Sequence, residues 1–224
     1  MGSPRGSLLG YRIFLDDCKL HGANFASITA WRVMKLLAVA AILLVSSGAG
    51  ACELSLVTPA RSLPTNGVQA DAKLVDDTLT VHFSVSAPSL NAKKILAPGE
   101  YPYQFDVVEL FVTFSDSGFP YFEFEVSPYN QTFQVRIVGE KEHHEAVNLG
   151  LKSTATMVPG GWNAELSIPL KPLGWDGDRA KIRGNFYSVL GQGRARGYWS
   201  AFLPKAPKAN FHQPQYFQPL LSCS

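Results

Sequence analysis

Residues 108–126 read VELFVTFSDSGFPYFEFEV, two runs of alternating apolar residues joined by a turn-forming link. Apolar residues occupy positions 108, 110 and 112 of the first run and positions 122, 124 and 126 of the second. A period of two is typical of half-buried strands, because successive side chains of a strand point to opposite faces of a sheet. The link, Ser115-Asp-Ser-Gly118, is rich in residues that favour turns. The stretch therefore predicts two strands connected by a turn.

The same alternation recurs over residues 79–85, 133–137 and 162–168. Further strands are expected near 52–57, 68–75, 149–157, 181–190 and 198–203. No helical pattern of 10–15 residues separates these segments, and this is typical of sandwiches and barrels. We therefore predict an all-β fold, an antiparallel β-sandwich of jelly-roll or immunoglobulin-like type with about nine to eleven strands, formed by one domain over residues 52–224.

The residues before this domain have a different character. Met34 and Lys35 precede an apolar run, Leu36 to Val45, and small residues ending in Ala49-Gly50-Ala51 follow. This pattern predicts a signal peptide over 34–51, since the run is shorter than the roughly 20 residues that a membrane-spanning helix needs. Residues 1–33 would then be an upstream extension outside the mature protein, which is expected to be secreted or periplasmic.

The cysteines allow two interpretations of the mature chain. Removal of residues 1–51 takes away Cys18 and leaves Cys52 and Cys223, which an oxidising compartment would allow to form a disulfide. The small residues before Cys52 also suit a lipid-anchored N-terminal cysteine, although the usual leucine three positions earlier is missing. We favour the disulfide.

Charge and motifs exclude several functions. Residues 52–224 contain 15 Lys plus Arg and 16 Asp plus Glu, a net charge of about −1, so a nucleic-acid partner has no electrostatic support. The sequence contains no G-x-S-x-G, no H-E-x-x-H and no phosphate-binding loop. Glu123 and Glu125 have a spacing that a glycosidase could use, but any alternating strand supplies it. We identify no catalytic residue.

Charged and amide residues stand opposite the apolar positions of several expected strands. They are Glu109, Glu123, Glu125, Arg136, Arg183 and Asn185. On neighbouring strands they would line a polar, concave sheet face suited to sugar hydroxyls, which donate and accept hydrogen bonds. The alternative is an ordinary solvated face with cross-strand ion pairs.

Aromatic residues near the expected loops form a second group of candidates. They are Tyr101, Tyr103, Tyr129, Trp175, Tyr198, Trp199 and Phe202. A flat ring can cover the apolar C–H face of a pyranose, although most such rings instead fill the ends of a sandwich core.

Metal binding has weaker support. The acidic turns Asp76-Asp77 and Asp176-Gly-Asp178 offer oxygen ligands for Ca²⁺, so calcium is a possible cofactor. His143 and His144 are adjacent, and adjacent strand residues point to opposite faces, so they are poorly placed to chelate one ion.

Six segments, taken in order, resemble the family 9 carbohydrate-binding modules and their wider DOMON-like relatives. They are FDVVELFV (105–112), YFEFEVSP (121–128), GWNAELSIPL (161–170), IRGNFY (182–187), YWSAF (198–202) and FHQP (211–214). The resemblance implies a β-sandwich that binds oligo- or polysaccharide, often attached to a glycoside hydrolase and with structural calcium in some members.

The resemblance also implies roles for individual residues. In the family an aromatic pair clamps a terminal sugar, and polar side chains bond its hydroxyls. The matching polar positions are Glu109, Glu123, Glu125, Arg183 and Asn185. Tyr103 and Trp199 are the candidate stacking surfaces, with Tyr101 and Tyr103 standing where sugar-binding members tend to have tryptophan. We also expect Glu109 and Arg183 to be neighbours on adjacent strands.

The sequence therefore predicts an exported, non-catalytic carbohydrate-binding domain that assists a separate glycoside hydrolase. The main alternative is a cell-envelope interaction or structural domain. Lesser alternatives are a haem-binding domain, with Met157 and His82 or His212 as axial ligands, and a glycosyl hydrolase.

Overall fold

In a computed structural model, residues 52–56, 67–139, 144–146, 148–202 and 210–221 are described, the first and third of these segments by their backbone only. They all belong to one compact unit of the chain, Ser47–Ser224. The expected leader and upstream extension, His143 and Cys223 lie outside the described residues. The signal peptide, the cysteine pairing and the lipid anchor therefore stay predictions.

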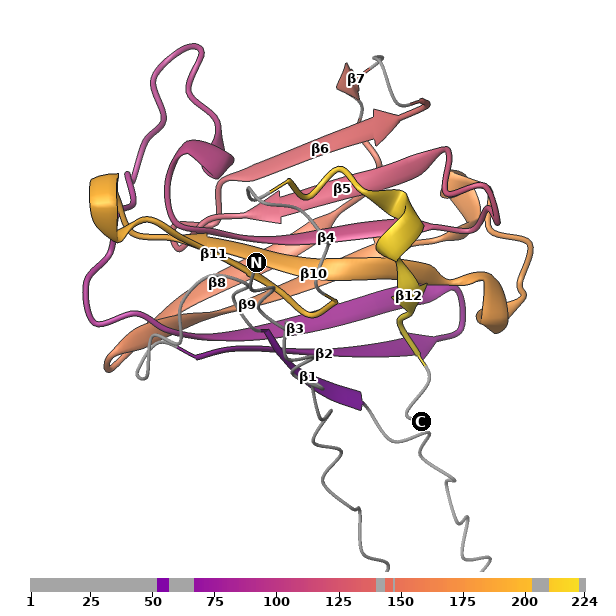
Figure 1. The fold of residues 1–224 in the computed structure, drawn as a ribbon, viewed down its shortest axis with the longest axis horizontal. Coiled ribbons are helices and arrows are strands. Elements are labelled where there is room, and N and C mark those ends of the chain that lie inside the picture. Colours follow the sequence, from indigo (N-terminus) through magenta and orange to yellow (C-terminus); the bar gives the residue numbers. More distant parts are fainter. Residues whose placement is uncertain (1–51, 57–66, 140–143, 147, 203–209, 222–224) are drawn as a thin grey trace, which may run out of the picture. The chain divides into compact units, whose positions relative to one another are not determined.

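A five-stranded antiparallel sheet forms one layer, in the order β1-β2-β3-β9-β8 (Figure 1). Its strands are β1 (Cys52–Leu56), β2 (Val68–Val75), β3 (Thr78–Ser86), β9 (Gly161–Pro169) and β8 (Lys152–Val158). Buried and more exposed residues alternate along β3 because one face of this sheet packs on the core and the other faces solvent.

The larger sheet has the order β11-β10-β4-β5-β6-β7, and β12 pairs with the edge of β10. Its strands are β11 (Gly197–Ser200), β10 (Arg183–Leu190), β4 (Val107–Thr113), β5 (Tyr121–Val126), β6 (Thr132–Ile137), β7 (His144–Ala146) and β12 (Gln218–Pro219). All the strand pairs are antiparallel.

The main core lies between the two sheets. Phe83 of β3 meets Phe186 of β10 edge to face, with ring centroids 5.9 Å apart, and Trp162, Leu166 and Phe124 are fully buried around them. The predicted all-β sandwich is thus confirmed. Every strand expected from the alternation is present, and only the short β7 and β12 were not predicted.

A second apolar cluster covers the outer face of the larger sheet, opposite the main core. Phe111, Tyr121, Tyr187 and Phe217 belong to it, and the segment 210–219 lies across this face, as the yellow ribbon in Figure 1 shows. As a result β4 and β5 are buried along their whole length. The expectation that these two strands are half-buried is wrong, because both of their faces are covered.

The helices among the described residues are 3-10 turns of three residues each, and none of them is long or apolar enough to cross a bilayer.

Candidate functional site

A pocket of about 720 Å³ opens on the outer face of the larger sheet. Pockets for small ligands typically measure about 300–1,000 Å³. Strands β4, β5, β6, β10 and β11 supply part of the lining, and the rest comes from the segment before β4, the β10–β11 connection and the C-terminal segment. The lining residues are Tyr101, Tyr103, Glu109, Phe111, Glu123, Phe133, Val135, Val189, Arg196, Tyr198, Asn210, Phe211 and His212.

Strand register brings three carboxyl groups onto this face. Glu109 of β4 pairs with Glu125 of β5, and Phe111 pairs with Glu123. Because directly opposed residues of antiparallel strands share a face, Glu109, Glu123 and Glu125 lie side by side. Glu109 and Glu123 line the pocket although they are only 3% and 6% exposed.

Glu125 is fully buried and is not part of the lining. Its Oε2 accepts a hydrogen bond of 3.0 Å from the backbone N–H of Tyr103, whereas its Oε1 has no partner in the described part of the chain. The carboxyl of Glu125 thus holds the Tyr103 backbone against the sheet.

The local electrostatics oppose ionisation of all three acids. Burial raises the pKa of Glu109 well above its ordinary value, and the charge of Glu123 adds to this effect while Arg196 opposes it. Burial, together with the charges of Glu109 and Glu123, likewise raises the pKa of Glu125. Burial raises the pKa of Glu123 to about 7. Burial therefore favours the protonated forms of Glu109 and Glu125, and Glu123 titrates near neutral pH.

Two tyrosines form one wall of the pocket. The rings of Tyr101 and Tyr103 are stacked, with centroids 5.3 Å apart and planes 5° from parallel, and both meet the edge of Phe133. They are 41% and 40% exposed. Each ring thus has area available to a ligand while its orientation is fixed by its neighbours.

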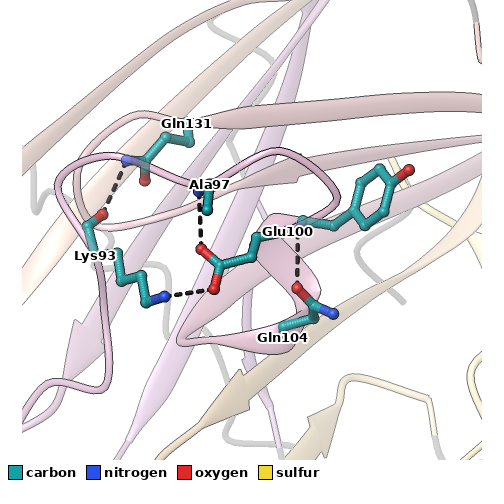
Figure 2. Close-up of polar contacts among 6 residues, drawn as sticks. Lys93, Ala97, Glu100, Gln104 and Gln131 are labelled. Atoms are coloured by element: carbon teal, nitrogen blue, oxygen red, sulfur yellow. Dashed lines mark hydrogen bonds and ion pairs between the residues drawn. The ribbon is translucent and has the colours of Figure 1, made fainter.

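Polar contacts brace the segment that carries this wall (Figure 2). The Glu100 carboxylate pairs with Lys93 and accepts a hydrogen bond of 2.9 Å from the backbone N–H of Ala97. The Gln104 side chain accepts one from the Tyr101 N–H, and Gln131, from the β5–β6 turn, donates to the Lys93 carbonyl. The tyrosine wall therefore stands on an internally bonded loop.

Arg196 and Tyr198 form the wall contributed by the β10–β11 connection and β11. The Arg196 guanidinium donates to the carbonyl oxygens of Gln104 and Tyr103, at 2.9 and 2.6 Å, and to the hydroxyl of Tyr198 at 3.1 Å. Arg196 thus ties both walls together and orients the Tyr198 ring, which is 37% exposed.

Asp106, which is fully buried, fixes the spacing of these two walls. Its carboxylate accepts backbone N–H bonds from Asn91 at 2.9 Å and from Gly191 at 2.6 Å. The Asn91 side chain in turn donates to the Gly191 carbonyl. Burial raises the pKa of Asp106, and these two hydrogen bonds oppose that effect.

The C-terminal segment closes the remaining side. Phe211 stacks on Tyr187 with centroids 4.1 Å apart, and its carbonyl accepts a hydrogen bond from the Tyr187 hydroxyl. The Tyr121 hydroxyl lies 2.7 Å from Nδ1 of His212.

The structure places only some of the predicted site residues in this pocket. Tyr103, Glu109 and Glu123 line it, and Glu125 lies directly beside them in the sheet. Their role in sugar binding stays a prediction.

Trp199 cannot serve as a stacking surface because it is 4% exposed and packs in the core between the sheets. Its neighbour on β11, Tyr198, points to the opposite face and lines the pocket. Alternation alone could not decide which of the two faces outward, because the register of β11 on β10 is not visible in the sequence.

Asn185 and Arg183 also have structural roles outside the pocket. The Asn185 amide donates to the Phe202 carbonyl and to Ser200, and its oxygen accepts from the Phe202 N–H, so it fastens the chain after β11. Arg183 donates to the Phe217 carbonyl, next to β12.

The expected proximity of Glu109 and Arg183 is wrong. Arg183 pairs with Thr113, whereas Glu109 pairs with Tyr187, four positions further along β10. The two strands are adjacent, but this offset separates the two residues by about 13 Å along the strand.

The acidic turns have other uses within the described residues. Asp77 pairs with Lys171 at 2.6 Å, Asp176 pairs with Lys181 at 2.5 Å, and Asp178 caps a 3-10 turn by accepting from the Ala180 N–H. Among the residues that the structure describes, no group of three or more His, Cys, Asp or Glu side chains is arranged to hold a metal ion.

Comparison with known proteins gives matches to solved structures only. No family model matches the sequence, and no curated protein matches it either.

A "putative carbohydrate-binding protein" from Bacteroides uniformis ATCC 8492 superimposes with a TM-score of 0.63 at 19% identity, over 76% of this chain and 85% of that chain. A family 9 carbohydrate-binding module from Caldicellulosiruptor kristjanssonii, solved in complex with cellotriose, superimposes with a TM-score of 0.50 at 18% identity, over 76% of this chain and 79% of that one. The chain has the fold of a family 9 carbohydrate-binding module. The fold that the sequence resemblance implies is thereby confirmed.

Proposed function

We propose that the protein binds carbohydrate in the pocket on the outer face of the larger sheet. The observation that carries this proposal is the pairing of partly exposed tyrosine rings, Tyr103 and Tyr198, with the buried carboxyls of Glu109 and Glu123 in one pocket. Aromatic faces cover the apolar side of a pyranose, and carboxyl groups exchange hydrogen bonds with its hydroxyls. The similar fold of a module that holds cellotriose supports the same class of ligand.

We further propose that the domain is non-catalytic. Glycoside hydrolysis needs one carboxylate that is ionised and acts as nucleophile or base beside a protonated acid. Here burial raises the pKa of Glu109, Glu123 and Glu125 alike, and among the described residues no Lys or Arg forms an ion pair with any of them, so ionisation is disfavoured. Incubation with soluble glucans and an assay for reducing ends tests this, and no release above that of a boiled control is expected.

Export and cooperation with a separate glycoside hydrolase complete the proposal. They rest on the leader-like sequence over 34–51 and on the family resemblance. Fractionation of cells that express the untagged gene should recover the protein outside the cytoplasm, and recovery in the cytoplasm alone would contradict export.

Binding is best tested by isothermal titration of the full chain with cellotriose. Tyr198→Ala removes an exposed ring of the pocket and should weaken binding. Tyr129→Ala is the matched control, since Tyr129 has the same 37% exposure but lies at the β5–β6 turn outside the pocket. Equal affinity of the two variants would place the sugar elsewhere, and no heat with any of several oligosaccharides would reject the proposed function.

A further inference from the structure

The pocket carries more acidic than basic groups. Glu109 and Glu123 line it and Glu125 lies beside them, whereas Arg196 is the one Lys or Arg side chain in the described lining. Arg196 directs its guanidinium to two backbone carbonyls and the Tyr198 hydroxyl, and no ion pair in the described part of the chain joins it to any of the three acids. His212 also lines the pocket, with its Nδ1 directed to the Tyr121 hydroxyl.

Glu109 and Glu125 differ in their hydrogen-bond partners. Glu109 lines the pocket and is 3% exposed, so it is 97% buried. It takes part in no hydrogen bond among the described residues. Glu125, directly across the strand pair, shares a side-chain hydrogen bond with Glu123 and accepts another from the Tyr103 N–H, so its carboxyl is held within the protein. The great majority of buried polar groups in folded proteins are paired, so the Glu109 carboxyl points to a ligand that hydrogen-bonds to it.

The walls suit a donor that is positively charged. Tyr101, Tyr103 and Tyr198 are all partly exposed at the pocket. The face of an aromatic ring attracts a cation, and a buried carboxyl becomes easier to ionise when a cation lies beside it. A neutral hydroxyl would supply the hydrogen bond but no charge that favours ionisation of the carboxyl.

We propose that the ligand of this pocket is an amino sugar whose protonated amine is held by Glu109 and Glu123. The inference rests on the proposed function, because the sugar ring is taken to lie against the tyrosines. The amine donates to these two carboxyls and compensates the charge that either of them gains on ionisation.

Three trimers with the same β-1,4 linkage provide the test, because they differ only at carbon 2 of each sugar. They are the glucosamine trimer with a free amine, the N-acetylglucosamine trimer and cellotriose. In isothermal titrations of the full chain at pH 6, the glucosamine trimer should bind at least about tenfold more tightly than the two neutral trimers. This is the gain in affinity expected from one hydrogen bond to a charged group.

Proton release gives a second measurement that needs no variant. Because burial raises the pKa of Glu123 to about 7, this carboxyl is largely protonated at pH 6 in the empty pocket, and binding of the amine should ionise it and release a proton. The binding enthalpy of the glucosamine trimer should then depend on the ionisation enthalpy of the buffer, whereas that of cellotriose should not.

Glu109→Gln keeps the shape of the side chain and removes its ability to ionise, so it should lower the ratio of glucosamine-trimer to cellotriose affinity. Glu165→Gln removes an exposed carboxyl from the smaller sheet and should leave that ratio unchanged. If cellotriose binds as tightly as the glucosamine trimer, or if the preference survives in a folded Glu109→Gln protein, the amine is not the recognised group although carbohydrate binding stands. If no trimer binds, the proposed function and this inference both fail.

Discussion

Ionisation of Glu123 should make the fold less stable as the pH rises through neutrality. Burial raises the pKa of Glu123 from its ordinary 4.5 to about 7, so the folded chain holds a proton there that the unfolded chain has already lost. Stability falls with increasing pH wherever the folded state binds more protons. The contribution is complete below pH 4.5 and disappears as the pH rises through about 7.

The size of the effect follows from the two pKa values. The shift from 4.5 to about 7 corresponds to about 3 kcal/mol in the free energy of unfolding, most of which is lost between pH 5 and pH 8. Burial also raises the pKa of Glu109 and Glu125, so the wild-type protein should lose more than this over the same interval.

Urea unfolding of the wild type and of Glu123→Gln at pH 5 and pH 8 measures this loss. Glutamine does not ionise, so between the two pH values the variant should lose roughly 2–3 kcal/mol less than the wild type, whatever constant change in stability the amide itself causes. Glu165→Gln, on the exposed face of β9, should keep the wild-type profile. Parallel profiles for the wild type and Glu123→Gln would refute the argument that Glu123 is protonated by burial.

Three further predictions separate structural from binding roles. Trp199→Ala should lower the free energy of unfolding by about 3–5 kcal/mol in urea titrations. Tyr198→Ala should change it by less than about 0.5 kcal/mol and weaken sugar binding by about 1 kcal/mol. Similar stability losses in both variants would contradict their assignment to opposite faces. Asn185→Ala should lower the free energy of unfolding by about 2 kcal/mol, because the backbone groups of Phe202 lose their hydrogen-bond partner. An unchanged urea midpoint would show that these groups find other partners. Asp106→Ala should free the two loops that its carboxylate holds together, and titration with cellotriose should show a reduced affinity; full affinity would mean that the walls keep their spacing without it.

The strands were predictable because alternation is a local property. Residues 79–85 and 162–168 follow the period of two, and the structure places β3 and β9 over them, with Phe83 and Trp162 in the core. The turn-forming residues between the runs were informative for the same reason.

The covering of the outer face was not predictable from single strands. Phe111 occupies a position that the alternation assigns to the solvent side, and it is buried by His212 and Phe217 from a segment about 100 residues away. Phe111 shares its face of the strand with Glu109 and Thr113, and this aromatic residue between two polar ones was the only local sign of the second cluster.

The orientation of β6 was also beyond the local pattern. Its apolar residues Val135 and Ile137 pack on the outer face, whereas Gln134 points to the other side. There the Gln134 side chain accepts hydrogen bonds from the backbone N–H groups of Leu149 and Leu151, which need an acceptor in the chain before β8. Arg196 was missed for a related reason, because its partners are carbonyl oxygens that no side-chain pattern reveals.

A crystal structure of the full chain with a bound β-1,4-linked trimer tests the central claim most directly. The account predicts a sugar ring against Tyr103 or Tyr198, with a polar atom of the sugar within hydrogen-bonding distance of the Glu109 carboxyl. A sugar bound to the smaller sheet or to the solvent-exposed loops, with the pocket free of ligand, would contradict it.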